Sequence, residues 1–373
     1  MTIAQLARVT GLSRPTVDGV LAGLMSRGLV SIADGSVGGG RDAGRPAKLY
    51  EFEASAGLVA GLDVGAHVIR VVLADLAGTV IANDETYNDP DLGGGDTLDR
   101  VFALLDDVMA RADASPGDLL GVGVGVSGIV GADGRIALSW ALPTWNTVDI
   151  ASRIEQRYGC PVVLENDARM ASMAEHHVGA SKLADNAVYV LVGHRLSTSL
   201  IIDGKVHRGR HHASGEGSYL LFDEVDTDEA GNINWKTAET AEDVVSRSLK
   251  GEADSIAELS KFVEAIAPGI AALSLVVDPD VVVIGGGLSR AGGIVISALQ
   301  ESVHARIRVP ALPTLVQSQL GSEAVVVGGL IRAYELAGER LFGTAERSAP
   351  RLHLGAVLLP SDLRVPPVNV PRA

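Results

Sequence analysis

The stretch from Leu58 to Leu76, LVAGLDVGAHVIRVVLADL, contains the strand pattern on which the fold of this chain is based. Two runs rich in β-branched residues flank the segment Gly65-Ala66-His67, and this pattern predicts a strand, a tight turn and a second strand. Asp63 stands near the end of the first strand, and Gly65 permits close backbone approach at the turn. A phosphate site and a plain buried hairpin both remain open here, although the imidazole of His67 would crowd a phosphate.

The same pattern recurs later in the chain. Residues 187–192 and 197–202 predict another strand pair, and such internal duplication is typical of two similar lobes around a cleft. A buried strand over 280–284 then runs into Gly285-Gly286-Gly287 and a predicted helix over 289–305. This glycine segment either lets an adenine or a phosphate approach the backbone or closes tight packing within the protein.

The composition indicates a soluble protein with more than one domain. The chain has 373 residues, of which 47% are hydrophobic and 21% are charged, and its formal net charge is −15. Cys160 is the only cysteine, which excludes a disulfide framework or a thiolate metal cluster and is consistent with a reducing cytoplasm. The first ten residues lack the pattern of a signal peptide, and Asp278 and Asp280 interrupt the best membrane-length run, so no membrane association is expected.

The charge is distributed unevenly between the first 50 residues and the rest of the chain. Residues 1–50 carry six basic and three acidic side chains, and the remainder carries 25 basic and 43 acidic ones. An acidic body with a small basic head is typical of a nucleic-acid-binding appendage on a metabolite-binding domain.

Residues 1–52 have the pattern of a winged helix-turn-helix. An apolar stripe predicts a helix over 3–9, a glycine-containing turn follows, and a second amphipathic helix begins after Ser13. Strands over 30–32 and 48–52 then enclose a glycine-rich tip that resembles a wing. The side chains expected to meet DNA are at the start of the second helix and in the wing: Ser13, Arg14, Thr16, Arg41 and Arg45. The alternative is a two-helix appendage with a flexible linker, and the usual first helix of a three-helix domain is expected to be missing.

A polar segment, Glu165-Asn166-Asp167-Ala168, follows a short strand and precedes a helix over 169–177. Asn166 and Asp167 at such a junction are well placed to bind the hydroxyls of a small polar ligand, and Asp167 can act as a general base. The alternative is that one of them only caps the helix. Three histidines at 207, 211 and 212 match no standard zinc spacing, so no metal site is expected.

Several stretches taken together resemble the ROK family of repressors, open reading frames and sugar kinases. In chain order they are GLDVGAHVIRVVLADLAG, GVGVGVSG, LPTWNTVD, LENDARMASMAE, DGKVHRGRHHASGE and VVVIGGGLSRAG. The resemblance implies an α/β fold, in which a winged helix-turn-helix over 1–52 precedes a two-lobed actin-like ATPase domain of the duplicated ribonuclease H type over 57–343. A tail rich in Pro and Arg over 344–373 is expected to be loose.

The resemblance also assigns expected roles to single residues. The catalytic base of the kinases corresponds to Asp167, which is expected to be vestigial here, and no other catalytic residue is expected. The sugar contacts correspond to Asn166, Asp167, Glu216 and Gly128, and the remnants of the nucleotide loops are Asp63, Gly65, Gly285, Gly286 and Gly287.

Three departures from the family pattern argue against phosphoryl transfer. Tyr219 stands where the family has a histidine that binds sugar and zinc, the cysteine-rich zinc loop has no counterpart, and Gly193-His194-Arg195-Leu196-Ser197 lacks the glycines of the second phosphate segment. The sequence therefore predicts a cytoplasmic regulator without enzymatic activity or cofactor. Its expected partners are operator DNA, a sugar or sugar-derivative effector and a further copy of the chain in a homodimer or homotetramer. The alternative is an ATP-dependent sugar kinase of the glucokinase type.

Overall fold

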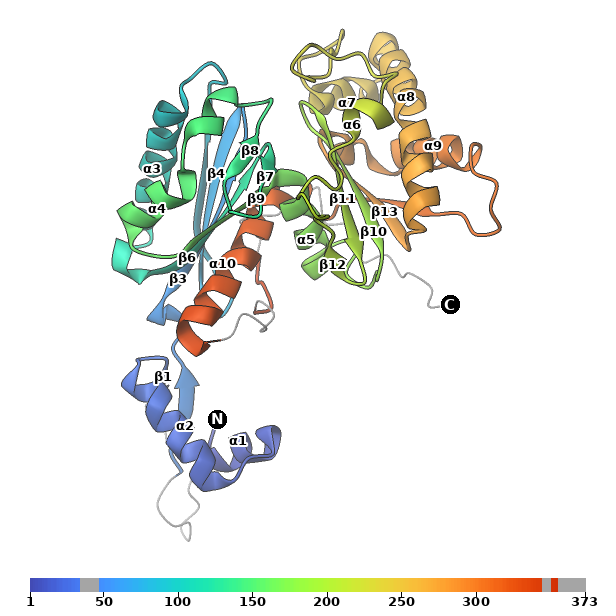
Figure 1. Cartoon of the computed structure of the whole chain (residues 1–373). Coiled ribbons are helices and arrows are strands. Elements are labelled where there is room, and N and C mark those ends of the chain that lie inside the picture. Colours follow the sequence, from blue (N-terminus) through green and yellow to red (C-terminus); the bar gives the residue numbers. More distant parts are fainter. Residues whose placement is uncertain (34–46, 344–349, 355–373) are drawn as a thin grey trace.

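The computed structural model describes residues 1–33, 47–343 and 350–354. A small N-terminal head is joined to a body of two lobes, with the chain running from the head into one lobe, then into the other, and back (Figure 1). Arg41 and Arg45, which the sequence places in a wing, lie outside the described residues.

The head contains two helices and a two-stranded antiparallel sheet: α1 Ile3–Thr10, α2 Arg14–Ser26, β1 Val30–Ile32 and β2 Tyr50–Phe52. Thr2 and Gln5 form a capping box at the start of α1, and Ser13 caps α2 by accepting a hydrogen bond from the backbone of Thr16. Val17, Leu21 and Tyr50 form its small core. The predicted helices, turn and strand pair are all present.

The first lobe is built on the hairpin from which the sequence argument began. Its five-stranded sheet has the order β5-β4-β3-β6-β9, with antiparallel pairing around β4 and parallel pairing of β3, β6 and β9. The strands are β3 Leu58–Val64, β4 Val68–Asp75, β5 Val80–Tyr87, β6 Leu119–Val126 and β9 Val162–Asn166. Helices α3 Gly94–Arg111 and α4 Ile150–Tyr158 contribute to the core beside this sheet, and a small hairpin consists of β7 Ile129–Val130 and β8 Ile136–Leu138.

The second lobe repeats this sheet. Its strand order is β12-β11-β10-β13-β14, again antiparallel around β11 and parallel from β10 to β14. The strands are β10 Ala187–Val192, β11 Leu196–Ile202, β12 Lys205–Val206, β13 Val281–Gly286 and β14 Thr314–Gln317. The helices are α6 Ser218–Leu221, α7 Ala241–Leu249, α8 Ala253–Val277 and α9 Gly292–His304. The matching strand orders confirm the predicted duplication.

Two helices join the lobes. They are α5 Asp167–Val178, which follows β9, and α10 Ala324–Phe342, by which the chain returns from the second lobe to the first (Figure 1). The two helices approach so closely that a Cβ on Gly328 of α10 would lie 2.1 Å from the carbonyl oxygen of Met170 on α5. Glycine is therefore required at this crossing.

Helix α8 is long and apolar enough to meet the composition criterion for a membrane span, although half of its most apolar window is buried inside the protein. Its buried side chains, such as Phe262, Ile266 and Ile270, belong to the core of the second lobe. This pattern is also that of a core helix.

The prediction of a loose tail was wrong for the part of the tail that the structure describes. His353 forms an isolated parallel bridge with Thr79, and its backbone N–H donates to the carbonyl of Gly78 over 2.8 Å. Leu352 and Leu354 are buried in the core that the lobes share. The two leucines attach this segment to the turn between β4 and β5, because burying them removes apolar surface from water.

Candidate functional site

Asn166 ends strand β9 and caps helix α5. Its Oδ1 accepts a hydrogen bond from the backbone N–H of Arg169 over 3.1 Å, and its Nδ2 donates to the carbonyl of Gly128 over 3.1 Å. The structure thus brings together Asn166 and Gly128, two of the residues expected from the family resemblance. The capping role that the sequence left open for Asn166 is present.

Asp167 is the first residue of α5, and both of its carboxylate oxygens are held. Oδ2 accepts from the hydroxyl of Ser127 over 2.6 Å, and Oδ1 accepts from the backbone N–H of Ala168 over 2.7 Å. Burial raises the pKa of Asp167, and these two hydrogen bonds act in the opposite direction. Each carboxylate oxygen can accept more than one hydrogen bond, so Asp167 retains the capacity to bind a ligand hydroxyl. Ser127 was not predicted from the sequence.

Arg169 organises the segment that follows β12. Its side chain is only 1% exposed and lies 3.3 Å from the carboxylate of Glu165, and its Nη2 donates to the carbonyls of His212 and Ser214 over 2.8 and 3.0 Å. Arg208 donates to the other oxygen of Glu165 over 2.6 Å. This buried network holds the loop from the second lobe against the start of α5. It was not predicted from the sequence.

Glu216 is brought to the same place by that loop. Its carboxylate lies 3.9 Å from Nη2 of Arg169, and its side chain is 29% exposed. Burial, with the negative charge of Asp167 as the next cause, raises the pKa of Glu216 to about 7. Asn166, Asp167 and Glu216 are therefore neighbours in the structure, as the resemblance implied, and they form one polar site beside the junction of the lobes.

The surroundings of Asp63, one of the expected remnants of the nucleotide loops, differ from what a metal-dependent kinase needs. Asp63 pairs with Arg70 over 3.2 Å, and Arg70 also donates to Glu85 over 2.8 Å and lies 3.9 Å from Glu323. Burial raises the pKa of Asp63 to about 7 although the charge of Arg70 acts in the opposite direction. A carboxylate that is already paired with a guanidinium is a poor ligand for magnesium, because the positive charge of Arg70 stands beside the oxygen that would bind the metal.

Replacing Asp63 with asparagine is expected to change how stability depends on pH. The pKa of Asp63 is about 7 in the folded state and near 3.9 in an unfolded chain, so the unfolded state releases this proton first as the pH rises. The free energy of unfolding of the parent therefore falls as the pH rises through that interval. Relative to the parent, Asp63→Asn should gain roughly 2–3 kcal/mol between pH 5 and pH 8 in urea denaturation.

The exposed Asp107 of α3 provides the matched control for this experiment. Asp107→Asn should leave the pH dependence of the parent unchanged. An Asp63→Asn variant with the parent's pH dependence would show that Asp63 is ionised throughout the range.

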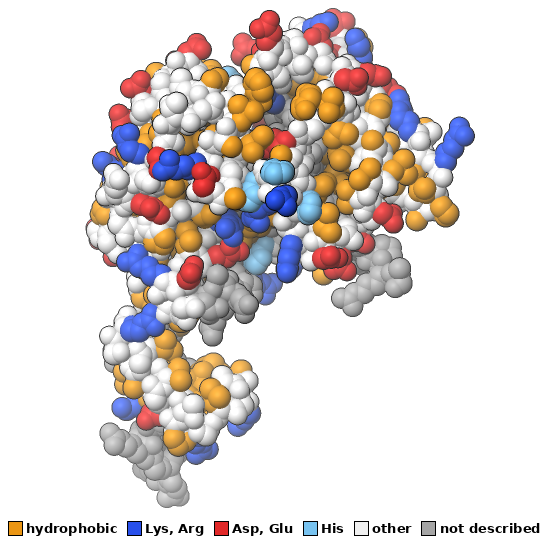
Figure 2. Space-filling model, in the orientation of Figure 1, with side chains coloured by type: hydrophobic (Ala, Val, Ile, Leu, Met, Phe, Trp, Pro, Cys, Tyr) orange, Lys and Arg blue, Asp and Glu red, His pale blue; other side chains and the backbone are white. Residues whose placement is uncertain are grey.

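The tight turns of the two lobes meet through a pair of histidines. The ring of His67, from the turn after β3, lies 4.0 Å from the ring of His194, from the turn after β10, at an interplanar angle of 42°. Burial lowers the pKa of both imidazoles, and for His194, where His67 and Arg195 add to the effect, it falls to about 4. Figure 2 shows histidine and basic side chains grouped between the lobes on the visible face. Two imidazole rings therefore meet at a tilted angle where the phosphate turns were expected, and this contact was not predicted.

Packing within the protein requires Gly285 and Gly286, which end β13, and Gly287, which follows it. A Cβ on Gly285 would lie 1.9 Å from the hydroxyl of Tyr189, and one on Gly286, whose φ is +74°, would lie 2.2 Å from the carbonyl oxygen of Val192. A Cβ on Gly287 would lie 3.0 Å from the backbone nitrogen of Glu242. Of the two interpretations that the sequence left open, tight packing is the one that these contacts support. At the turn after β3, a Cβ on Gly65 would lie 3.1 Å from the carbonyl oxygen of Val68.

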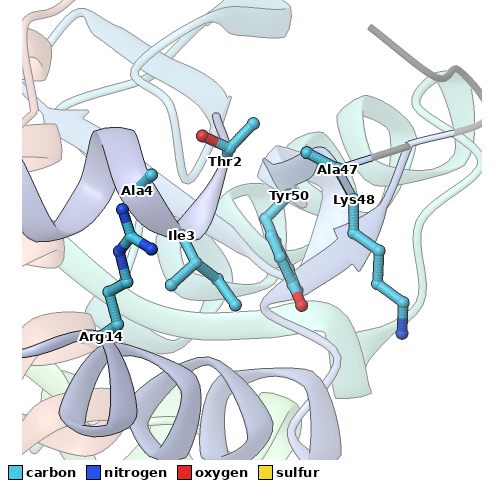
Figure 3. A pocket seen from close by; sticks show the side chains of 7 residues that line it. All are labelled: Thr2, Ile3, Ala4, Arg14, Ala47, Lys48 and Tyr50. Carbon is cyan, nitrogen blue, oxygen red and sulfur yellow. The ribbon is translucent and has the colours of Figure 1, made fainter. Parts of the chain in front are cut away.

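The head presents a basic cavity at the start of its two helices. The cavity has a volume of about 280 Å³ and is lined by Thr2, Ile3, Ala4, Arg14, Ala47, Lys48 and Tyr50 (Figure 3). Arg14 and Lys48 are exposed, so both can contact a phosphate. Ser13 and Thr16 bond to each other over 2.7 Å, which leaves capping of α2 as their observed role. Lys48 was not among the predicted contacts.

Within residues 1–33, 47–343 and 350–354, no group of three or more His, Cys, Asp or Glu side chains is arranged to hold a metal ion.

Comparison with known proteins adds two kinds of relative. The xylose repressor of Bacillus subtilis is 31% identical over 224 residues, which make up 59% of this chain and 56% of that repressor. The chain thus aligns with little more than half of the length of that relative. A glucokinase of Halalkalibacterium halodurans is 22% identical over 322 residues, covering 75% of this chain and 96% of that enzyme.

The crystal structure of a ROK family transcriptional regulator, a homolog of the E. coli MLC protein, matches with a TM-score of 0.69 and 18% identity over 93% of this chain and 95% of that chain. At this identity the likeness shows the fold. The sequence model of the ROK family matches residues 59–233 and 229–335. These ranges cover most of the chain and contain Asp63, Asp167 and Glu216, and the chain therefore belongs to the ROK family.

Proposed function

We propose that the chain is a transcriptional repressor whose head binds operator DNA and whose body binds a sugar or sugar derivative without phosphorylating it. The observation that carries this proposal is the set of side chains that lie where the two lobes meet. The polar site around Asp167 and Glu216 is assembled, whereas the rings of His67 and His194 lie in contact between the two turns where phosphates would have to enter.

The head supports the DNA-binding part of the proposal. Helix α2 follows a glycine-containing turn and begins with Arg14 beside the exposed Lys48, as expected of a reading helix with phosphate contacts at its start. The xylose repressor of Bacillus subtilis and the solved ROK regulator are the relatives on which the regulatory function is inferred. A symmetric assembly of two or four chains would place two heads over the halves of a pseudo-palindromic operator, with the protein acting in the cytoplasm.

The body supports the sensing part. Asp167 and Glu216 are acceptors for ligand hydroxyls, and Arg169 fixes the loop that carries Glu216. A ligand that contacts both the start of α5 and this loop, and that binds a closed arrangement of the lobes more tightly than an open one, shifts the protein toward the closed arrangement. Closing the lobes would alter the separation of the heads in the assembly.

Loss of phosphoryl transfer follows from the same cleft. Catalysis of this reaction depends on positioning the phosphates and on metal ions that neutralise developing charge. Asp63 is paired with Arg70, and the rings of His67 and His194 lie between the turns. A sugar kinase, the function named for the glucokinase of Halalkalibacterium halodurans, is therefore the less favoured candidate.

The proposal is tested by fluorescence anisotropy on duplexes that cover the region upstream of the gene, at two or more salt concentrations. The parent should bind at least one duplex specifically, and Arg14→Ala should bind it more weakly, with the slope of log affinity against log salt reduced by about 1. Arg153→Ala, which removes an exposed arginine from α4 in the body, is the matched control and should bind as the parent does. Absence of specific binding to every duplex would refute the repressor function.

The kinase alternative is tested by ADP formation with ATP, magnesium and a panel of hexoses and pentoses. We expect no sugar-dependent ADP above the rate without protein. ADP formation that depends on a sugar and is abolished by Asp167→Asn would establish a kinase in place of the sensor.

A further inference from the structure

Helix α10 extends from the junction of the lobes, the cleft of the proposed function, to the head. It has 19 residues and is therefore about 28 Å long. At its start, Glu323 lies 3.9 Å from Arg70, the residue that pairs with Asp63 in the cleft. In Figure 1 its other end lies directly above α2.

The far end of α10 meets the head through Arg27, which caps the C-terminus of α2. The Nη2 of Arg27 donates to the backbone carbonyl of Leu341 in the last turn of α10, and the guanidinium lies 6.0 Å from the centre of the Phe342 ring. The last carbonyls of a helix have no partner within the helix, and a positive charge is favourable at that end. A planar guanidinium can make this hydrogen bond and stack on an aromatic ring together.

The N-terminal part of α10 packs against the helix that carries the polar site. Gly328 lies against the backbone of Met170, three residues after Asp167 on α5. The two backbones meet without an intervening side chain, so little can absorb a relative movement of the two helices. A shift of α5 on ligand binding must therefore displace α10 or open a void.

We propose that α10 transmits the state of the cleft to the DNA-reading helix α2, and that Arg27 is the residue through which the movement passes. This inference rests on the proposed function, because it states how the polar site regulates the head. The short segment between β2 and β3 attaches the head to the first lobe at one point, where the carbonyl of Ala54 accepts from the backbone N–H of Leu76 over 3.0 Å. The contact of Arg27 with Leu341 and Phe342 is a second attachment, and it fixes α2 relative to the end of α10.

The proposal is tested by a double-mutant cycle on the affinity for a duplex that the parent binds. Arg70→Ala alters the cleft end of α10, and Arg27→Lys keeps the charge of the head but removes the planar fork. Arg70→Ala should change the operator Kd about threefold or more in the parent and leave it unchanged in the Arg27→Lys background. Glu323→Gln is a second change at the cleft end and should behave in the same way.

The matched control is Arg8→Lys, which alters an exposed arginine on α1 of the same head. In that background the effect of Arg70→Ala should persist. An effect of equal size with and without Arg27, or no effect of either cleft variant, would overturn the proposal.

Hydrogen exchange of the full chain without DNA separates this proposal from the proposed function. Arg70→Ala should change the exchange rates of the amides in α2 when Arg27 is present and leave them unchanged in Arg27→Lys. If no duplex is bound specifically but this response is seen, the repressor function has failed and transmission by α10 stands. If a duplex is bound but exchange in α2 responds regardless of Arg27, transmission through Arg27 is refuted and the repressor function stands.

Discussion

Replacing Arg169 with methionine is expected to lower the free energy of unfolding by about 3–5 kcal/mol. Methionine keeps an unbranched apolar chain but lacks the guanidinium, so the main loss is that of the charge and its hydrogen bonds. The change leaves the buried carboxylate of Glu165 with Arg208 as its remaining ionic partner, and it leaves the carbonyls of His212 and Ser214 without their donor. Removing one member of a buried, hydrogen-bonded charge network costs far more than removing a surface ion pair.

The measurement is urea denaturation followed by tryptophan fluorescence and circular dichroism. The control is Arg153→Met, which makes the same chemical change at an exposed position of α4 and should alter stability by no more than about 0.5 kcal/mol. An Arg169→Met protein as stable as this control would show that the network around Glu165 contributes nothing to the fold.

Replacing Gly328 with alanine is expected to destabilise the protein by about 1–3 kcal/mol, although alanine normally stabilises a helix relative to glycine by about 1 kcal/mol. The added Cβ would lie 2.1 Å from the carbonyl oxygen of Met170, a backbone atom that cannot move without shifting α5. The cost of separating two packed helices therefore exceeds the gain in helix propensity, and the sign of the effect reverses.

Gly95→Ala provides the comparison, since Gly95 lies near the start of α3 and a Cβ there would meet nothing within 4 Å. This variant should be as stable as the parent or up to about 1 kcal/mol more stable. The two proteins are compared by urea denaturation under identical conditions. If Gly328→Ala is stabilised like Gly95→Ala, the close approach of α10 and α5 does not exist in solution.

The elements that the sequence predicted are those with a local cause. The strands around Gly65 follow from β-branched runs with a turn between them, and the helices of the head follow from the cap at Ser13 and an apolar stripe. In the second helix Val17 and Leu21 are buried, whereas Val20, which shares their apolar spacing, is exposed. The duplication of the sheet was also predictable, since both copies repeat the same pattern within a short window.

The candidate site was only partly predictable. Asn166 and Asp167 were predicted from their position between a strand and a helix, and Glu216 was added by the family resemblance; the structure places them together. The burial of Arg169 could not be predicted, because an arginine in the first turn of a helix usually faces water and only tertiary contacts bury this one. The ion pair between Asp63 and Arg70 could not be predicted either, since Arg70 lies opposite Asp63 only through the register of β3 and β4.

The sequence by itself determined the architecture, namely a small head of two helices and a strand pair followed by two lobes with the same sheet, because periodicity, caps and glycines act over a few residues. The tertiary structure alone decided the chemistry of the cleft. It placed His67 against His194 and Arg70 against Asp63, packed the triple glycine against its neighbours, and set α10 between the cleft and Arg27. The reason is physical: burial, ion pairing and close packing depend on which surfaces meet, and these contacts join residues far apart in the chain.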